Sequence, residues 1–432
     1  MSPTMMVILA ICGFIAFLML GVPVAYSLGF IGLSLGLATL GPGVLAKLGN
    51  IPYYMLFNLD WIPLPLFILL GSLIAETTMG SDLFNAASKW LSRVPGGLMI
   101  SGIFGEAIMS AALGTSSSTI IVVGKVAVPE FQKHGYNRSL AIGSLLAGGV
   151  LGPLIPPSTT MIIYSVLTET SLGRLFTAGI MPGILCAVML AVPAFLICWR
   201  RPGYGAATGG VPWRERFASL TRIWPVILVI LAILGSIYFG VATPNESAGV
   251  GVVAVLIIGI TMFNLRWPGI RRAIIDAVTV NAMMMFVFTG ASLFSYIVGS
   301  GNAGKYVAEL VQSASISPWW VIIAINILLL ILCCPLDEIT VTFITLPIFV
   351  PLIVSLGFDP IWFGIVFLVN TQLGLISPPL GMDLFVTSTV FNIPTVQLLK
   401  GVLPFFLVLL VFLAIIIAFP QISLWLPSQM VK

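Results

Sequence analysis

Two short polar segments, 114–119 and 335–340, interrupt a strongly apolar sequence and could bind a hard cation. The first carries hydroxyl side chains and the second adds carboxylates. The residues are Thr115, Ser116, Ser117 and Ser118, and then Asp337, Glu338 and Thr340. Hard cations prefer hydroxyl, carbonyl and carboxylate oxygens as ligands. We therefore expect Na⁺ to bind in these segments, near Ser116, Ser117, Asp337 and Thr340.

Two further segments, 148–160 and 370–383, contain closely spaced glycines and prolines that interrupt a helix. An interrupted helix leaves carbonyl groups free for a cation and a helix N-terminus free for an anion. We expect both segments to bind substrate or ion. The residues are Gly152, Pro156, Pro157 and Ser158 in the first, and Asn370, Ser377, Pro378, Pro379, Gly381 and Asp383 in the second.

The composition indicates a membrane protein. The 432 residues are 59% hydrophobic and only 7% charged, whereas soluble domains carry about 25% charged residues. Apolar stretches long enough to span a bilayer recur from Met5 to Pro420, and within a bilayer they must be helical. The N-terminus shows no basic region or cleavage site, so we expect no removable signal peptide. The five cysteines lie in or beside apolar runs, where small hydrophobic side chains are expected.

The chain matches itself at a shift of 222 residues. Prolines and glycines coincide at this shift, and these residues punctuate helices at particular places. The matched pairs include Pro129 with Pro351, Gly135 with Gly357, Gly152 with Gly374, Pro156 with Pro378, and Gly179 with Gly401. The pattern therefore indicates an internal duplication.

Charge predicts that the two copies are inverted. The first copy is basic around 89–93 and 125–138, where the second carries no lysine or arginine. The second is basic at 266–272, where the first has only Lys47. Cytoplasmic loops collect lysine and arginine, so equivalent loops are expected on opposite sides of the membrane.

We expect five spans and one re-entrant hairpin in each copy. The basic linker 200–222 is predicted to be cytoplasmic, which places both termini in the periplasm. The first repeat, 1–199, has predicted spans near 5–21, 24–40, 62–80, 139–168 and 176–199, with a hairpin at 97–130. The second, 223–432, has predicted spans near 224–242, 247–265, 280–298, 361–392 and 396–418, with a hairpin at 318–350. The spans 139–168 and 361–392 are expected to be broken.

Structural interpretations of the polar residues stay open. Serine and threonine runs often form hydrogen bonds between membrane helices. Asp337 and Glu338 could lie in a surface loop. The remaining acidic residues in or near spans are interpreted as structural pairs or interface charges: Glu76, Glu106, Glu246 and Asp276.

Catalysis is poorly supported. The one histidine, His134, lies in a basic loop, so a serine–histidine arrangement inside the membrane is implausible. Asp337 and the Gly381–Asp383 segment faintly suggest an intramembrane aspartyl protease, but this leaves the duplication unexplained. No phosphate-binding glycine loop or metal-ligand cluster appears. We therefore expect a protein that is not an enzyme.

The sequence resembles the large membrane subunit (M, or DctM type) of the tripartite ATP-independent periplasmic transporters, known as TRAP. The resemblance extends over nearly the whole chain. Its motifs are short, but their ordered combination is specific. They are Gly114–Thr119, Val128–Tyr136, Gly152–Ser158 and Leu375–Gly381.

The resemblance implies an elevator-type importer driven by Na⁺, in which a transport domain moves against a fixed scaffold. It also implies a periplasmic binding protein that delivers a small organic anion, and a separate four-helix small subunit (Q), in the bacterial inner membrane. C4-dicarboxylates, sialic acid and other sugar acids are candidate substrates. A carboxylate carrier that works without a binding protein is the alternative.

Overall fold

The computed structural model describes residues 3–300, 317–378 and 381–430. All of the regular elements in these ranges are helical, which confirms the all-α, multi-span prediction. The α-helices of the first half are α1 (Pro3–Met19), α2 (Val24–Leu40), α3 (Val44–Phe57), α4 (Pro63–Ala75), α5 (Met79–Trp90), α6 (Gly97–Leu113), α7 (Ser116–Lys133), α8 (Arg138–Gly148), α9 (Leu151–Leu154), α10 (Thr159–Thr168) and α11 (Leu172–Arg200).

Some helices of the second half match helices of the first in spacing. Helices α7 and α17 each have 18 residues and begin 222 positions apart, and α8 and α18 also begin 222 positions apart. The remaining α-helices are α12 (Trp213–Tyr238), α13 (Pro244–Met262), α14 (Trp267–Ser300), α16 (Pro318–Leu332), α17 (Glu338–Ser355), α18 (Pro360–Ile376), α19 (Met382–Val390), α20 (Thr395–Ala418) and α21 (Gln421–Ser428). The inverted orientation of the halves stays a prediction.

Each half contains a helical hairpin followed by an interrupted helix. Helices α6 and α7 pack together on either side of a turn at Gly114, whose φ of 67° favours glycine. The chain from α8 through α9 to α10 bends by 41° at the glycine–proline segment. In the second half, α16 and α17 flank the turn at 333–337, and α18 ends at Ile376, before Ser377. Both polar segments therefore lie at hairpin turns.

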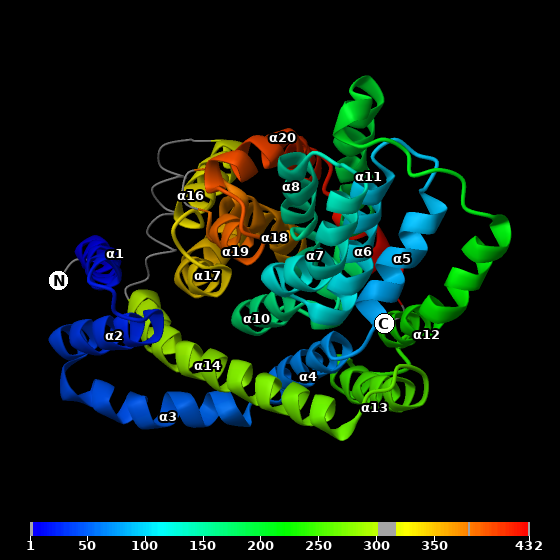
Figure 1. Ribbon diagram of the computed structural model, residues 1–432. Helices are drawn as coiled ribbons and strands as arrows, with labels where there is room; N and C mark the ends of the chain where they lie inside the picture. Colours follow the sequence, from blue (N-terminus) through cyan, green and yellow to red (C-terminus); the bar gives the residue numbers. More distant parts are fainter. Residues whose placement is uncertain (1–2, 301–316, 379–380, 431–432) are drawn as a thin grey trace.

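The helices form two groups (Figure 1). Helix α14 runs along α2 and α4, and α13 packs beside α4, so these helices form one layer. The hairpins and interrupted helices gather in a block on one side of that layer. Contacts of α14 with α17 and of α4 with α6 and α10 join the block to the layer. The molecule thus presents a boundary between the layer and the block.

The helices depart from the prediction in several places. Among the described helices, six are long and apolar enough to cross a membrane, or up to eight if each bent pair is one span. The predicted single span 62–80 is wrong, because α4 ends at Ala75 and α5 continues at 66° to it. The predicted linker 200–222 is helical from Trp213 onward, and α3 and α21 were not anticipated.

Two equivalent glycines let the interrupted helices approach the hairpin turns. A Cβ atom added to Gly152 would lie 2.7 Å from the backbone nitrogen of Ser116. A Cβ atom on Gly374 would collide with Cys333 in the turn of the second hairpin. The close approach of backbones therefore requires glycine at both positions.

We expect Gly152→Ala and Gly374→Ala each to destabilise the protein by about 1–3 kcal/mol, because the added methyl group overpacks a backbone contact. The measurement is the unfolding free energy of the purified protein in mixed micelles. The control is Gly235→Ala in α12, where nothing lies within 4 Å of the added Cβ. Equal losses in the three variants would contradict the close-approach account.

Candidate functional site

The first hairpin turn presents hydroxyl groups to the second half of the chain. Ser116 and Ser117 begin α7, and Asp383 lies in the first turn of α19. The Ser116 hydroxyl donates to Oδ2 of Asp383 at 2.6 Å, and the Ser117 hydroxyl donates to Oδ1 at 2.5 Å. Asp383 is only 2% exposed, so these two bonds stabilise a carboxylate that would otherwise be costly to bury.

The second hairpin turn makes the reciprocal contact. Thr160, at the start of α10, donates its hydroxyl to Oε1 of Glu338, the first residue of α17. The Gln372 side chain in α18 donates to the other oxygen, Oε2, at 2.8 Å. Each hairpin turn is thus bonded to the interrupted helix of the opposite half.

These two contacts occupy repeat-equivalent positions. Ser116 and Glu338 are related by the shift of 222, and Thr160 and Asp383 by a shift of 223 that includes one extra residue. In one pair the hairpin supplies the hydroxyl and the interrupted helix the carboxylate, and in the other pair the roles are exchanged. The two pairs of positions related by these shifts therefore each hold a hydroxyl–carboxylate pair, with the acidic residue on the hairpin in one pair and on the interrupted helix in the other.

Asp337 has a local role in the structure. Its carboxylate caps α17 by accepting from the Thr340 backbone nitrogen at 3.1 Å, and the Thr340 hydroxyl donates to its other oxygen. Ser116 and Ser117 instead bond to Asp383. The four residues expected near Na⁺ therefore form two separate bonded groups, and Asp383 joins the serines.

In each half of the chain, the hairpin turn lies close to the break in the interrupted helix. Thr159 donates from its backbone and hydroxyl to the Gly114 carbonyl, at 3.4 and 3.1 Å. The Cys334 thiol lies 3.9 Å from the Ser377 and Pro378 carbonyl oxygens. Each hairpin turn therefore contacts the break of its own half, and Ser116, Ser117 and Glu338 also bond to the other half.

The other expected site residues differ in their hydrogen bonds and in their burial. Ser158 caps α10 by accepting from the Met161 nitrogen, and the Ser377 hydroxyl donates to the Gly374 carbonyl at 2.9 Å. Asn370 is buried and donates to the Asn326 side chain at 2.5 Å. Pro156 and Pro157 are buried, Gly381 lies close to the end of α18, and Pro378 is exposed. Pro379 lies outside the described residues.

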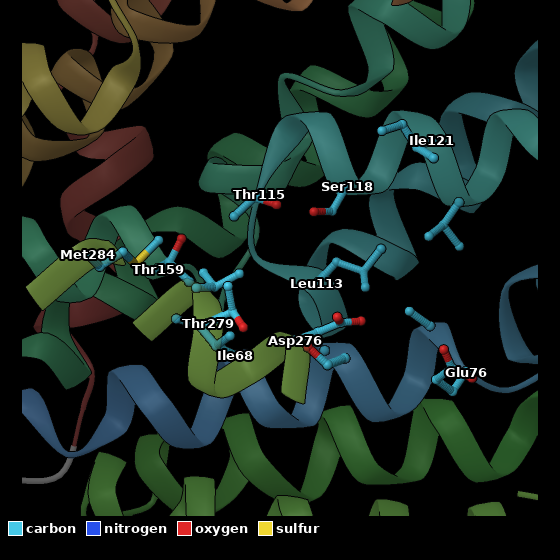
Figure 2. Close-up of a pocket in the computed structure, with 15 residues that line it drawn as sticks. Ile68, Glu76, Leu113, Thr115, Ser118, Ile121, Thr159, Asp276, Thr279 and Met284 are labelled. Carbon is cyan, nitrogen blue, oxygen red and sulfur yellow. The ribbon is translucent and has the colours of Figure 1, made fainter. Parts of the chain in front are cut away.

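A cavity of about 380 Å³ opens beside the first hairpin turn, between the helical layer and the block (Figure 2). Thr115, Ser118 and Thr159 line the wall formed by the block. Asp276 and Thr279 of α14 line the opposite wall, with Glu76 at the edge of α4. None of the lining residues is lysine, arginine or histidine.

The acidic residues interpreted as structural have different environments. Glu76 forms a salt bridge with Arg272 at 2.6 Å, and Glu246 forms a capping box with Thr243, as expected of structural residues. Asp276 lines the cavity. Glu106 is fully buried in α6, and neither of its carboxyl oxygens has a partner among the described residues. The prediction that Glu106 is a pair or an interface charge is therefore wrong.

The sequence reasoning missed Thr159, Thr160 and Gln372. Thr160 could have been found from the repeat, because it aligns with Asp383 once the one-residue insertion is allowed. Gln372 carries no such signal, since its contact with Glu338 depends on how α17 packs against α18.

The oxygen donors of the site fit a hard monovalent cation. Around Asp383 they comprise a carboxylate and two hydroxyls, and around Glu338 a carboxylate and a hydroxyl, because Gln372 turns its amide nitrogen toward Glu338. Among the described residues there is no group of three His, Cys, Asp or Glu side chains of the kind that holds a transition metal. The donor set therefore resembles an alkali-metal site more than a zinc site.

Comparison with known proteins gives a match to a family model over residues 11–422. The model describes the DctM component of the tripartite ATP-independent periplasmic transporter. The chain is 33% identical to the C4-dicarboxylate TRAP transporter large permease protein DctM of Pseudomonas aeruginosa, with 85% of this chain and 86% of that protein covered. It is 31% identical to the sialic acid TRAP transporter large permease protein SiaM of Vibrio cholerae, with 97% and 98% covered.

A third relative and two solved structures extend the comparison. The ectoine TRAP transporter large permease protein TeaC of Halomonas elongata is 30% identical, with 84% of this chain and 85% of that protein covered. The YdaH transporter of Alcanivorax borkumensis has a TM-score of 0.62 at 13% identity, with 89% of each chain covered. MtrF of Neisseria gonorrhoeae has a TM-score of 0.61 at 13% identity, with 89% and 85% covered. At this identity the two structures share the fold.

We expect the crossed contact of Ser116 with Asp383 to show a coupling energy of about 1.5–3 kcal/mol, because the acceptor is a buried carboxylate. A double-mutant cycle of Ser116→Ala and Asp383→Asn, measured as unfolding free energy in mixed micelles, tests this. The control cycle uses Thr78 and Asp82, whose exposed 3.1 Å hydrogen bond should couple by less than about 0.5 kcal/mol. Additive effects of Ser116→Ala and Asp383→Asn would refute the contact.

Proposed function

The chain belongs to the DctM component family of the tripartite ATP-independent periplasmic transporters, and from this premise we propose that it is the membrane transport subunit of a Na⁺-coupled, binding-protein-dependent importer of small organic anions. The observation that carries the proposal is the pair of crossed hydroxyl–carboxylate contacts beside a cavity. Ionisable groups within membrane-spanning segments are costly, and they usually mark the path of a substrate or an ion. The relatives named above are transport permeases, so transport is preferred to catalysis.

Na⁺ is the proposed coupling ion, and Asp383, Ser116 and Ser117 would hold it. When bound, the ion would supply a positive charge that neutralises the Asp383 carboxylate. Glu338 and Thr160 form the equivalent donor group in the other half. Because the two halves share this site, ion binding would depend on the positions of both hairpin turns.

The cavity supports an anionic substrate only if a cation accompanies it. Its lining supplies hydroxyls from Thr115, Ser118 and Thr159 and no cationic side chain. The N-termini of α7 and α10 begin at this wall, and a helix N-terminus favours negative charge. Asp276 on the opposite wall disfavours an anion. Na⁺ bound to Asp383 would remove one further negative charge from this region, which supports coupling of ion and anion binding.

The substrate class is proposed from the relatives. Their names specify C4-dicarboxylates, sialic acid and ectoine. A cavity of about 380 Å³ accommodates a small organic acid of this kind. The hydroxyl lining favours a ligand with several hydrogen-bonding groups.

An elevator movement is the proposed mechanism. The cavity lies at the boundary between the layer of α2, α4, α13 and α14 and the block of hairpins and interrupted helices. A block that slides along the layer would carry the site from one side of the membrane to the other. The layer would then act as the scaffold.

The partners and location follow from the same proposal. A four-helix small subunit (Q type) would brace the scaffold, and a periplasmic binding protein would deliver the substrate. The chain would lie in the bacterial inner membrane with the basic segment 200–222 in the cytoplasm and both termini in the periplasm.

We expect proteoliposomes that contain this chain and its small subunit to accumulate a radiolabelled organic acid only with both an inward Na⁺ gradient and the cognate binding protein. A panel of C4-dicarboxylates, sugar acids and ectoine identifies the substrate. Uptake without the binding protein would replace the proposal with a stand-alone carrier. Uptake that ignores the Na⁺ gradient would refute the coupling.

We expect Asp383→Asn to lower the initial uptake rate at least about tenfold, since loss of one charged ligand removes more than about 1.4 kcal/mol of ion binding. Asp337→Ala should cost about 1 kcal/mol of stability through its cap and lower uptake less. The control is Glu130→Gln, which removes a half-exposed carboxylate paired with Lys133. Normal uptake by Asp383→Asn at an equal level of folded protein would sink the site assignment.

A further inference from the structure

An exposed aromatic cluster lies where the end of α5 meets the start of α12. The rings of Trp90, Trp213 and Phe217 lie within 5.6–6.2 Å of one another, centroid to centroid. Trp213 and Phe217 are 59% and 58% exposed. The Trp90 indole nitrogen donates to the Arg216 carbonyl at 3.3 Å, which fixes the ring against α12. Figure 1 shows α5 and α12 side by side at one edge of the molecule.

A buried arginine without a carboxylate partner lies beneath this cluster. Arg216 is 6% exposed, and its guanidinium lies 4.9 Å from the Trp213 ring centroid. One terminal nitrogen donates to the Ser92 hydroxyl at 3.3 Å, and the Nε nitrogen has no partner among the described residues. None of the ion pairs among those residues includes Arg216. A buried cation of this kind is stabilised by an anion nearby.

The surrounding charge is predominantly positive. The Arg93 guanidinium lies over Gly210, since a Cβ added there would be 3.3 Å from its Nη2 atom. Arg214 is exposed on α12, and Lys89 lies in the last turn of α5. Glu215 is the one acidic side chain in the first turn of α12, and Asp82 is already paired with Arg222 at 3.6 Å. Positive charge therefore exceeds negative charge around the cluster.

We propose that this patch, formed by Trp90, Arg93, Trp213, Arg214, Arg216 and Phe217, binds the phosphate group of an anionic phospholipid. Arg93 and Arg214 would contact the phosphate, with the buried charge of Arg216 below it. The exposed rings of Trp213 and Phe217 would lie in the boundary between headgroups and acyl chains, where amphipathic aromatic rings are favoured.

The position of the patch favours a lipid over free phosphate. Helix α12 begins with the charged stretch 213–222 and then becomes apolar enough to span the membrane. The patch therefore lies where a span enters the headgroup region. Basic residues at that depth attract anionic lipids, each by about 1 kcal/mol. A soluble ion would contact the arginines but would leave the rings without apolar partners.

The experiment measures binding of phosphatidylglycerol to the delipidated full chain in neutral detergent, by native mass spectrometry and by the shift in melting temperature. Phosphatidylcholine and inorganic phosphate at equal phosphate concentration are the comparison arms. We expect phosphatidylglycerol alone to stabilise the wild type. Arg93→Gln with Arg214→Gln should weaken its binding about tenfold or more.

A matched control removes the same charge elsewhere. Arg174→Gln with Lys400→Gln changes two exposed basic residues outside the patch and should leave phosphatidylglycerol binding unchanged. Equal weakening by the two double variants would overturn the site. An equal effect of inorganic phosphate would overturn the assignment to a lipid, and an equal effect of phosphatidylcholine would overturn the requirement for an anionic headgroup.

A second measurement does not depend on charge removal. Phosphatidylglycerol with brominated acyl chains should quench tryptophan fluorescence more than brominated phosphatidylcholine does. We expect most of the excess to vanish when Trp90→Phe and Trp213→Phe are combined, which keeps both aromatic rings but removes the fluorophores of the patch. Undiminished excess quenching in this variant would contradict contact of the lipid with the patch.

Discussion

A buried carboxylate must be hydrogen-bonded or neutralised, and the arrangement of the hairpins depends on this constraint. Asp383 meets it through Ser116 and Ser117, and Glu338 meets it through Thr160 and Gln372. Each carboxylate takes a partner from the other half of the chain, so the position of each hairpin turn depends on the opposite half. With both turns in place the polar site is closed, and the cavity lies on one side of it.

The membrane class, the hairpin turns and the breaks could be predicted because they are local in sequence. Closely spaced glycines and prolines interrupt a helix, and composition alone sets the helical class. The crossed partners could not be predicted in this way. Ser116 and Asp383 are 267 positions apart, and their contact depends on how the two halves pack. The sequence therefore predicted Na⁺ near Asp337, which the structure shows capping its own helix, and not near Asp383.

The boundary between layer and block combines several separate features. The cavity lies there, its block wall carries the hydroxyls of Thr115, Ser118 and Thr159, and its layer wall carries Asp276 and Thr279. The break between α4 and α5 lets α5 leave the layer and pack on α6 and α12. That same turn brings Trp90 to α12. The bend at the end of the predicted span 62–80 thus supports the patch of aromatic and arginine residues as well as the layer.

The central claim is that Asp383 and the two serines bind Na⁺ together across the halves. Equilibrium binding of radioactive sodium to the purified chain, with and without Ser116→Ala plus Ser117→Ala, tests it most directly. The account predicts saturable binding by the wild type and binding at least about tenfold weaker in the double variant, because two ligands are lost. Unchanged sodium binding by a folded double variant would contradict the account.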